Sequence, residues 1–151
     1  MHDVPKALAA VSAAAALVGG CASAPAPPPF MPATSVVELM ESVIVHAAEV
    51  YWDSVSIIVD ESGITENFPQ TDEEWEEVWS AALSIAESGN LLMMEPRAVD
   101  NGAWMEMSAA LVQVGAEAAE AALARDPDRV LAMGEQVYNV CLVCHARYIV
   151  E

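Results

Sequence analysis

Two cysteines and a histidine close to the end of the 151-residue sequence have a spacing that suits a specific chemistry. Cys141, Cys144 and His145 form the pattern C-x-x-C-H, which is typical of covalent haem attachment. Thiols one helical turn apart can each form a thioether with one of the two haem vinyl groups, and the adjacent imidazole can ligate the iron. The pattern therefore predicts one covalent haem c with His145 as an iron ligand.

Other interpretations of the two cysteines are weaker. A thioredoxin-like C-x-x-C motif accompanies a βαβ pattern, which this sequence lacks. A structural zinc site needs about four ligands, but the sequence has three cysteines, and its only histidines besides the one in the motif are His2 and His46. A disulfide between Cys141 and Cys144 stays open as an alternative.

Residues 1–20 have the pattern of a signal peptide. Lys6 precedes an alanine-rich apolar run that is too short to span a bilayer comfortably. The run closes with Leu-Val-Gly-Gly-Cys21, which resembles the lipobox of bacterial lipoproteins, so we expect Cys21 to be lipidated and to anchor the protein to a membrane. Cleavage after Ala24 is the alternative. We predict a periplasmic, membrane-anchored lipoprotein of a Gram-negative bacterium.

Composition divides the remaining sequence into a tether and one domain. Residues 21–33 are rich in proline and alanine, a composition that favours extended chain and cannot bury a core. Residues 34–151 are sufficient for one compact core and too few for two domains.

The domain is predicted to be all-α, with four helices and no strand. Capping boxes at Ser35 and Thr71 and the pair Asp126-Pro127 mark three helix starts. On the last helix both thiols share the apolar stripe that should face the core. Trp52, Trp75, Trp79 and Trp104 are candidates to stack on a haem, and most of them are expected to be core residues. The expected helices run from 35 through 58 with Gly63 as terminator, from 72 to a stop at Gly89-Asn90, from 101 to 124, and from 127 to 148.

Four amphipathic helices with C-x-x-C-H on the last one resemble the cytochrome c′ and cytochrome c-556 group over residues 35–151. The resemblance implies an up-and-down four-helix bundle with one haem between its helices, and pairing of two copies through the first two helices. Tyr148 matches the aromatic residue that follows the haem histidine in this group. Members commonly have a basic residue next, where this chain has Ile149, and Arg147 is a candidate substitute.

The same resemblance suggests the second iron ligand. In c-556 members a methionine early in the first helix is the sixth ligand, whereas in cytochromes c′ a bulky apolar residue leaves the iron five-coordinate. Met40 falls at the corresponding place, and imidazole with thioether suits electron transfer. The alternatives are Met93, Met94, His46 or no sixth ligand, with Met40 as a core residue.

One arginine and the overall charge complete the candidate features. Arg97 is a candidate partner of a haem propionate, and a solvated loop arginine is its alternative. A formal charge of −18 opposes nucleic-acid binding and favours redox partners with basic surfaces, although it also keeps a protein soluble.

These observations predict a monohaem c-type cytochrome that carries electrons outside the cytoplasm. The alternative is a five-coordinate haem protein that binds nitric oxide or carbon monoxide, and a more distant one is a non-haem acidic lipoprotein that serves as an interaction module. We do not expect an enzyme, because the sequence shows no base and nucleophile pair and no open metal triad.

Overall fold

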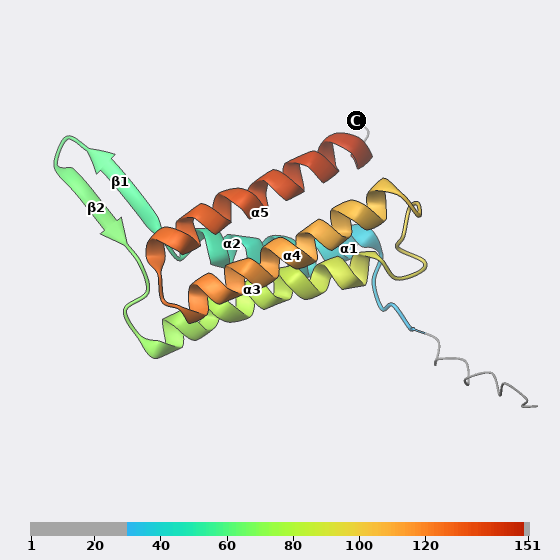
Figure 1. Ribbon diagram of the computed structural model, residues 1–151, viewed down its shortest axis with the longest axis horizontal. Coiled ribbons are helices and arrows are strands. Elements are labelled where there is room, and N and C mark those ends of the chain that lie inside the picture. Colours follow the sequence, from blue (N-terminus) through green and yellow to red (C-terminus); the bar gives the residue numbers. More distant parts are fainter. Residues whose placement is uncertain (1–29, 150–151) are drawn as a thin grey trace, which may run out of the picture.

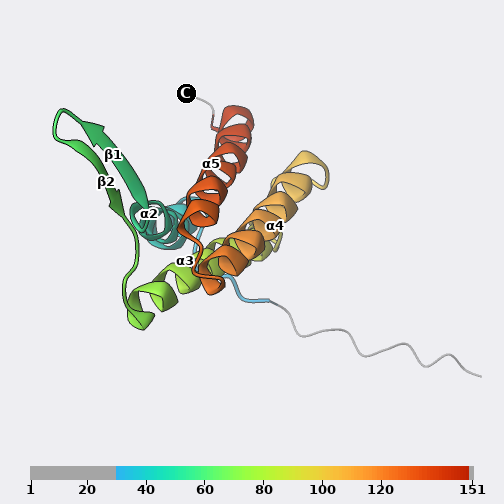
Figure 2. The same ribbon diagram turned by 60° about the vertical axis from the view of Figure 1, so that its left-hand side comes forward.

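The computed structural model describes residues 30–149 and is mostly helical. Successive helical segments run in opposite directions, and a small hairpin projects from one end of the molecule (Figures 1 and 2). The predicted signal peptide and the candidate anchor Cys21 lie outside the described residues. The elements are α1 (Val36–Leu39), the π-helical turn η1 (Met40–Ile44), α2 (Val45–Asp53), β1 (Ser56–Asp60), β2 (Gly63–Asn67), α3 (Asp72–Leu92), α4 (Ala103–Leu123) and α5 (Pro127–Tyr148).

The three predicted helix starts carry the predicted caps. The hydroxyl of Ser35 accepts a hydrogen bond from the backbone N–H of Glu38, whose carboxylate accepts one in return, and Thr71 and Glu74 repeat this arrangement. Asp126 accepts from the backbone N–H three residues later, and proline follows it as the first residue of α5. The accepted hydrogen bonds lower the pKa of both capping glutamates. These starts are confirmed.

The first helical segment is shorter than predicted. It ends at Asp53, and residues 56–67 form an antiparallel hairpin in which Asp60 pairs with Gly63. The prediction of a helix through Ile58, and of no strand, is therefore wrong. The run Ile-Ile-Val that includes Ile58 fits a helical stripe, but β-branched residues favour extended chain, and the positive φ of Gly63 (132°) suits a tight turn.

The π-turn η1 changes which side chains of this segment are buried. Leu39, just before the turn, and Ile44, the last residue of the turn, are both buried, and burial continues through Ala48 and Tyr51. A π-turn inserts one extra residue and so rotates the following helix relative to a regular 3.6-residue period. Met40, on the predicted buried stripe, is consequently half-buried.

The glycine predicted to stop α3 instead lets two helices approach closely. α3 continues through Leu92, and a Cβ atom on Gly89 would lie 2.5 Å from the backbone oxygen of Ser108 in α4. A Cβ atom on Gly115 would lie 2.5 Å from the backbone nitrogen of Ala86. The predicted stop is therefore wrong, and the physical reason is that helix packing, not chain termination, requires the missing side chain at Gly89.

α5 is less buried than the other long helices. Its buried residues are Val130, Gly134 and Val137, whereas Cys141 and Cys144 are half-buried at the edge of the core. The structure therefore places the thiols where a cavity can border them. Between residues 30 and 149, none of the helices combines the length and the apolar character needed to cross a membrane.

Candidate functional site

A cavity of about 130 Å³ lies between α5 and the first helical segment, with α3 and α4 contributing to its walls. Met40 borders it from η1, while Cys141, Cys144 and His145 border it from α5. The structure thus brings Met40 and the three C-x-x-C-H residues to one cavity. Its apolar walls include Ile44, Val45, Ala48, Leu92, Leu111 and Val140.

The two thiols are free and lie on the same wall. Because α5 is a regular helix, Cys141 and Cys144 are one turn apart on one side of it. Burial raises the pKa of both thiols, and the neighbouring sulfur of Cys144 contributes to the rise at Cys141. His145 is exposed at the border of the cavity. No disulfide joins Cys141 and Cys144 in this structure.

These residues fit a covalent haem. Two thiols and an adjacent imidazole would supply the attachment and one axial ligand, and Met40 on the first helical segment would supply a thioether as the second. The walls between them are apolar, as a porphyrin face requires, and no lysine or arginine is among the described residues that line the cavity.

Met40 lies at a local irregularity of the backbone. It is the first residue of the π-turn, and turns of this kind occur frequently at functional sites. Its carbonyl oxygen accepts the backbone N–H of Val45, five residues later. The π-turn therefore changes the orientation of the following residues relative to Met40, compared with a regular α-helix.

The competing ligands are distributed unequally around the cavity. Met93 and Met94 are half-buried but do not line it. Met107 of α4 does line the cavity, so it offers a second thioether beside Met40. Leu111, one turn further along α4, lines the cavity with it, and a shared helical stripe does not by itself distinguish a core residue from a cavity residue.

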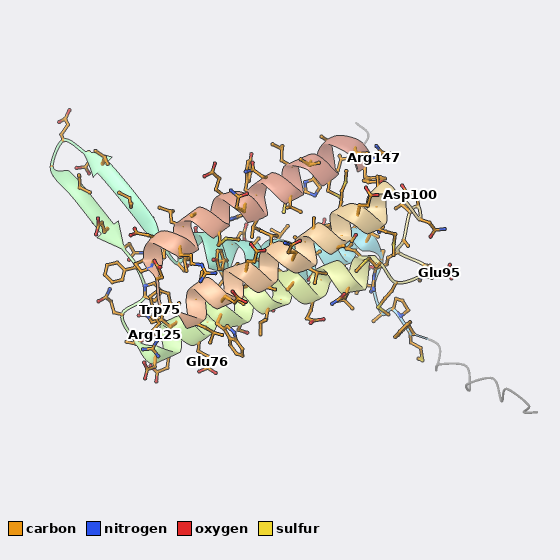
Figure 3. The ribbon with its side chains drawn as sticks, viewed as in Figure 1. Trp75, Glu76, Glu95, Asp100, Arg125 and Arg147 are labelled. Carbon is orange, nitrogen blue, oxygen red and sulfur yellow. The ribbon has the colours of Figure 1, made fainter. Side chains whose placement is uncertain are left out.

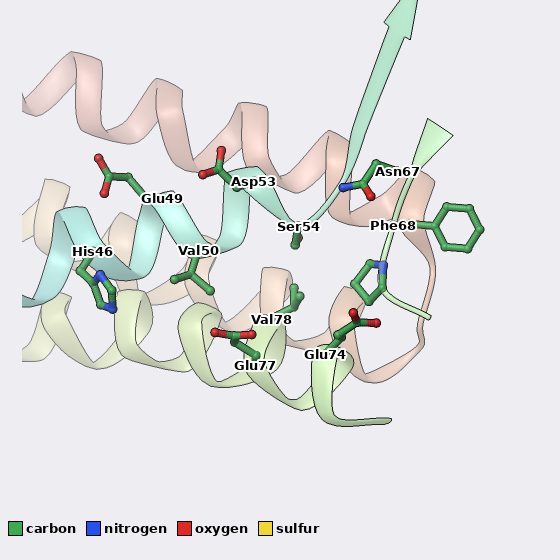
Figure 4. Close-up of a pocket in the computed structure, with 11 residues that line it drawn as sticks. His46, Glu49, Val50, Asp53, Ser54, Asn67, Phe68, Glu74, Glu77 and Val78 are labelled. Atoms are coloured by element: carbon green, nitrogen blue, oxygen red, sulfur yellow. The ribbon is translucent and has the colours of Figure 1, made fainter. Parts of the chain in front are cut away.

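His46 belongs to a different part of the surface. It is exposed and borders an acidic hollow of about 450 Å³ formed by α2, α3 and the segment that follows β2 (Figure 4). The carboxylates of Glu49, Asp53, Glu74 and Glu77 border the same hollow. His46 does not line the cavity that Met40 and the C-x-x-C-H residues border.

Arg97 is a buried residue with its own partners. It is 6% exposed, so the alternative of a solvated loop arginine is wrong. Its Nε and Nη2 donate to the backbone oxygen and the hydroxyl of Thr34, both at 3.0 Å, and Nη1 donates to the backbone oxygen of Leu91 at 3.2 Å. Arg97 thus ties the segment before α1 to the end of α3. It does not line the cavity, and its pairing with a propionate stays a prediction.

Tyr148 fixes the end of α5, one turn after His145. Its ring packs edge-on against Trp104, with centroids 5.1 Å apart, and its hydroxyl donates to the carboxylate of Asp100. Asp100 also accepts two backbone N–H groups at the start of α4, at 2.8 and 3.1 Å. The hydrogen bond from Tyr148, together with these two, lowers the pKa of Asp100. Figure 3 shows Asp100 and Arg147 at the same end of the molecule, where the Arg147 guanidinium lies 5.7 Å from the centre of the Tyr148 ring.

Trp52 differs from the other three tryptophans in being exposed. Most of the tryptophans were expected in the core. Trp75 and Trp104 are buried and Trp79 is half-buried, whereas Trp52 is 36% exposed. It lines the cavity with Met40 and the α5 motif.

Comparisons with protein-family models, with curated proteins and with solved structures gave no match. The resemblance to cytochromes c′ and c-556 therefore rests on the residues of this chain alone. Within residues 30–149, no group of three or more His, Cys, Asp and Glu side chains is arranged to hold a metal ion.

Proposed function

We propose that this protein is a monohaem c-type cytochrome that carries electrons outside the cytoplasm. Cys141 and Cys144 attach the haem, and His145 and Met40 are its axial ligands. The observation that carries the proposal is that Met40 and the C-x-x-C-H residues, from the first and last helical segments, border one apolar cavity.

In this proposal the four helical segments form an up-and-down bundle around one haem. The haem, when bound, supplies one-electron chemistry at its iron, and an imidazole with a thioether raises the potential of that couple. The chain holds the ring through two thioethers on the wall of α5. Ile44, Leu111 and Val140, which line the cavity, would exclude water from a bound haem and so favour its less charged, reduced state. No substrate turnover is assigned to the site.

The acidic surface supports electron transfer to basic partners. A formal charge of −18 on a small protein produces a negative field that accelerates encounter with a positively charged surface. We expect such an encounter to slow as ionic strength rises, because salt screens charges over about 10 Å at 0.1 M.

Production of the protein with a c-type maturation system tests the attachment. Mass spectrometry should show one haem added covalently, and the Cys141→Ser and Cys144→Ser double variant should lack it. Absence of a covalent haem from the unaltered chain would overturn both the electron-carrier proposal and the gas-binding alternative.

The spectrum of the reduced protein tests the coordination. A sharp low-spin α-band with no response to carbon monoxide is expected of His145 and Met40 ligation. A high-spin spectrum with ready carbon monoxide binding would instead support the five-coordinate, gas-binding alternative.

Two methionine variants separate the candidate ligands. Met40→Ala should convert the iron from low to high spin, whereas Met107→Ala, which alters the same cavity from α4, should leave the low-spin spectrum intact. The reverse result would transfer the ligand role to Met107. Conversion by neither variant would remove both.

The proposed location is tested at Cys21. Radiolabelled fatty acid should be incorporated into the full chain, and the protein should fractionate with membranes. Cys21→Ser should abolish labelling and release the protein, while a Ser23→Ala control should not. Unchanged membrane association of Cys21→Ser would reject the lipid anchor.

A further inference from the structure

A surface cleft of about 410 Å³ lies beside the cavity that holds the candidate haem-binding residues. It is bordered by residues of α2 and α5 and by Val55, which follows α2. Trp52 lines both the cleft and the cavity. Trp52 therefore lies between the cavity and the surface cleft.

The Trp52 ring is held in place by α5. Its Nε1 donates a hydrogen bond to the backbone oxygen of Gly134 at 2.9 Å, and the Tyr138 ring meets it edge-on with centroids 6.2 Å apart. A Cβ atom on Gly134 would lie 3.2 Å from Cδ1 of the indole, so the glycine permits this close approach. A ring fixed in this way keeps its position when the surface is covered by another protein.

The surface around Trp52 has the composition of a docking site. Tyr138 is 53% exposed, Leu131 is 41% exposed and Trp52 is 36% exposed. We call these three residues the Trp52 face. Aromatic and aliphatic side chains of this kind form the centre of protein interfaces, where tryptophan and tyrosine contribute most to affinity.

Carboxylates flank the Trp52 face. Glu135 borders the cleft from α5, and Glu49 borders the adjacent cavity from α2. Figure 4 shows Glu49 and Asp53 on the part of α2 that lies toward α5. Among the described residues that line the cleft or the cavity, none is a lysine or an arginine. An apolar centre with an acidic border is complementary to an apolar centre with a basic border.

We propose that the Trp52 face is the docking surface for a basic electron-transfer protein, and that Trp52 lies on the path of the electron. This inference rests on the proposed function. One electron passes from the reduced iron of this protein to the oxidised metal centre of the partner, and neither a bond nor a proton is exchanged. The aromatic ring replaces solvent in the gap between the two centres, which favours transfer because electron tunnelling is slower across water-filled space than through packed protein.

The hairpin is the main competing surface. Ile57, Val59 and Ile64 are exposed on it, and by strand alternation they share one face. No residue of β1 or β2 lines the cavity with the haem-binding motif. A partner on the hairpin would therefore be remote from the proposed haem, whereas one on the Trp52 face would contact a residue of its pocket.

Charge reversal tests the location, with a basic single-haem cytochrome c as the probe. Glu135→Lys in the haem-loaded protein should weaken the Kd at low ionic strength by about fivefold, and the effect should disappear at high salt. The matched control is Glu76→Lys, because Glu76 lies on the side of α3 away from α5 (Figure 3) and the net charge changes equally. Equal weakening by both variants would overturn the docking site.

Aromatic variants test the surface and the path separately. Tyr138→Ala should weaken the Kd by about tenfold, as for an interface hot spot. Trp52→Leu should slow electron transfer within the preformed complex, measured after flash reduction, more than it changes the Kd. An unaltered transfer rate would remove Trp52 from the path. If Trp52→Leu fails to fold, the exposed variants Glu135→Lys and Tyr138→Ala still decide the docking site.

The spectrum keeps the two proposals distinguishable. If the chain lacks a covalent haem, the proposed function fails. If the haem is present and low-spin but the surface variants do not differ from their control, only the docking surface fails.

Discussion

The two sides of the helical domain are packed by different rules. Between α3 and α4, small residues bring the backbones together, and Cβ atoms on Gly89 and Gly115 would each lie 2.5 Å from backbone atoms of the opposite helix. Between α5 and the first helical segment, Trp52 packs against Gly134, and a cavity bordered by Met40 lies beside it.

The difference separates stability from function. At Gly89 and Gly115 the close packing of α3 on α4 leaves no space for a ligand, and it contributes dispersion and apolar burial that a cavity cannot. The side that contains α5 gives up part of that contribution, and it is the side where the two thiols, the imidazole and a thioether meet. Changes on the first side should therefore lower stability, and changes on the second should alter the haem.

The largest effect on stability is expected at Gly115. Gly115→Ala should lower the free energy of unfolding by about 3 kcal/mol, because the new methyl group meets the backbone of Ala86 and α3 must shift. Gly134→Ala in α5 is the matched control, since its methyl group would meet side chains and not backbone, with Cδ1 of Trp52 nearest at 3.2 Å. Its cost should stay within about 1 kcal/mol. Urea denaturation measures both, and equal costs would contradict the comparison.

Arg97 should have the next largest effect. Arg97→Met removes the hydrogen bonds to Thr34 and Leu91 and should lower the free energy of unfolding by about 2 kcal/mol. Arg125→Met breaks a surface ion pair with Asp72 and should cost less than about 1 kcal/mol. A variant at Arg97 that shifts the haem potential without destabilising the protein would instead indicate pairing with a propionate.

Met40 should behave in the opposite way to Gly115. Met40→Leu nearly conserves volume, so the free energy of unfolding should change by less than about 1.5 kcal/mol, while the low-spin spectrum is lost. Gly115→Ala should retain that spectrum in the folded protein. Spectroscopy and urea denaturation of both variants test whether Met40→Leu changes the spectrum and Gly115→Ala the stability. A Met40→Leu protein that stays low-spin would refute this prediction.

The smallest effect is expected from protonation of Asp100. Its pKa is lowered in the folded protein by the hydrogen bond from Tyr148 and by two backbone N–H groups. The carboxylate therefore contributes stability above its unfolded pKa, and this contribution is lost as pH falls through the lowered folded pKa, below about pH 4. Amides at the start of α4 should then exchange faster with solvent. Asp100→Asn should remove this pH dependence, and an unchanged profile would show that Asp100 is not its source.

Local signals in the sequence determined the helix starts. The capping boxes at Ser35 and Thr71 and the pair Asp126-Pro127 act through hydrogen bonds within four residues, so they form in the structure as predicted. The same holds for the spacing of Cys141 and Cys144, because one helical turn is a local property. The sequence by itself therefore determined the mostly helical fold and the motif on α5.

The tertiary structure decided the features that depend on distant contacts. Gly89 is a residue type that often ends helices, but here it allows the backbone of α4 to approach closely. The Ile-Ile-Val run after α2 forms β1 and pairs with β2 instead of continuing the helix. The π-turn at Met40 and the placement of Trp52 at a cavity likewise depend on what packs against them. The extra residue of the π-turn changes which side chains face the other helices, so packing against those helices decides whether the turn forms.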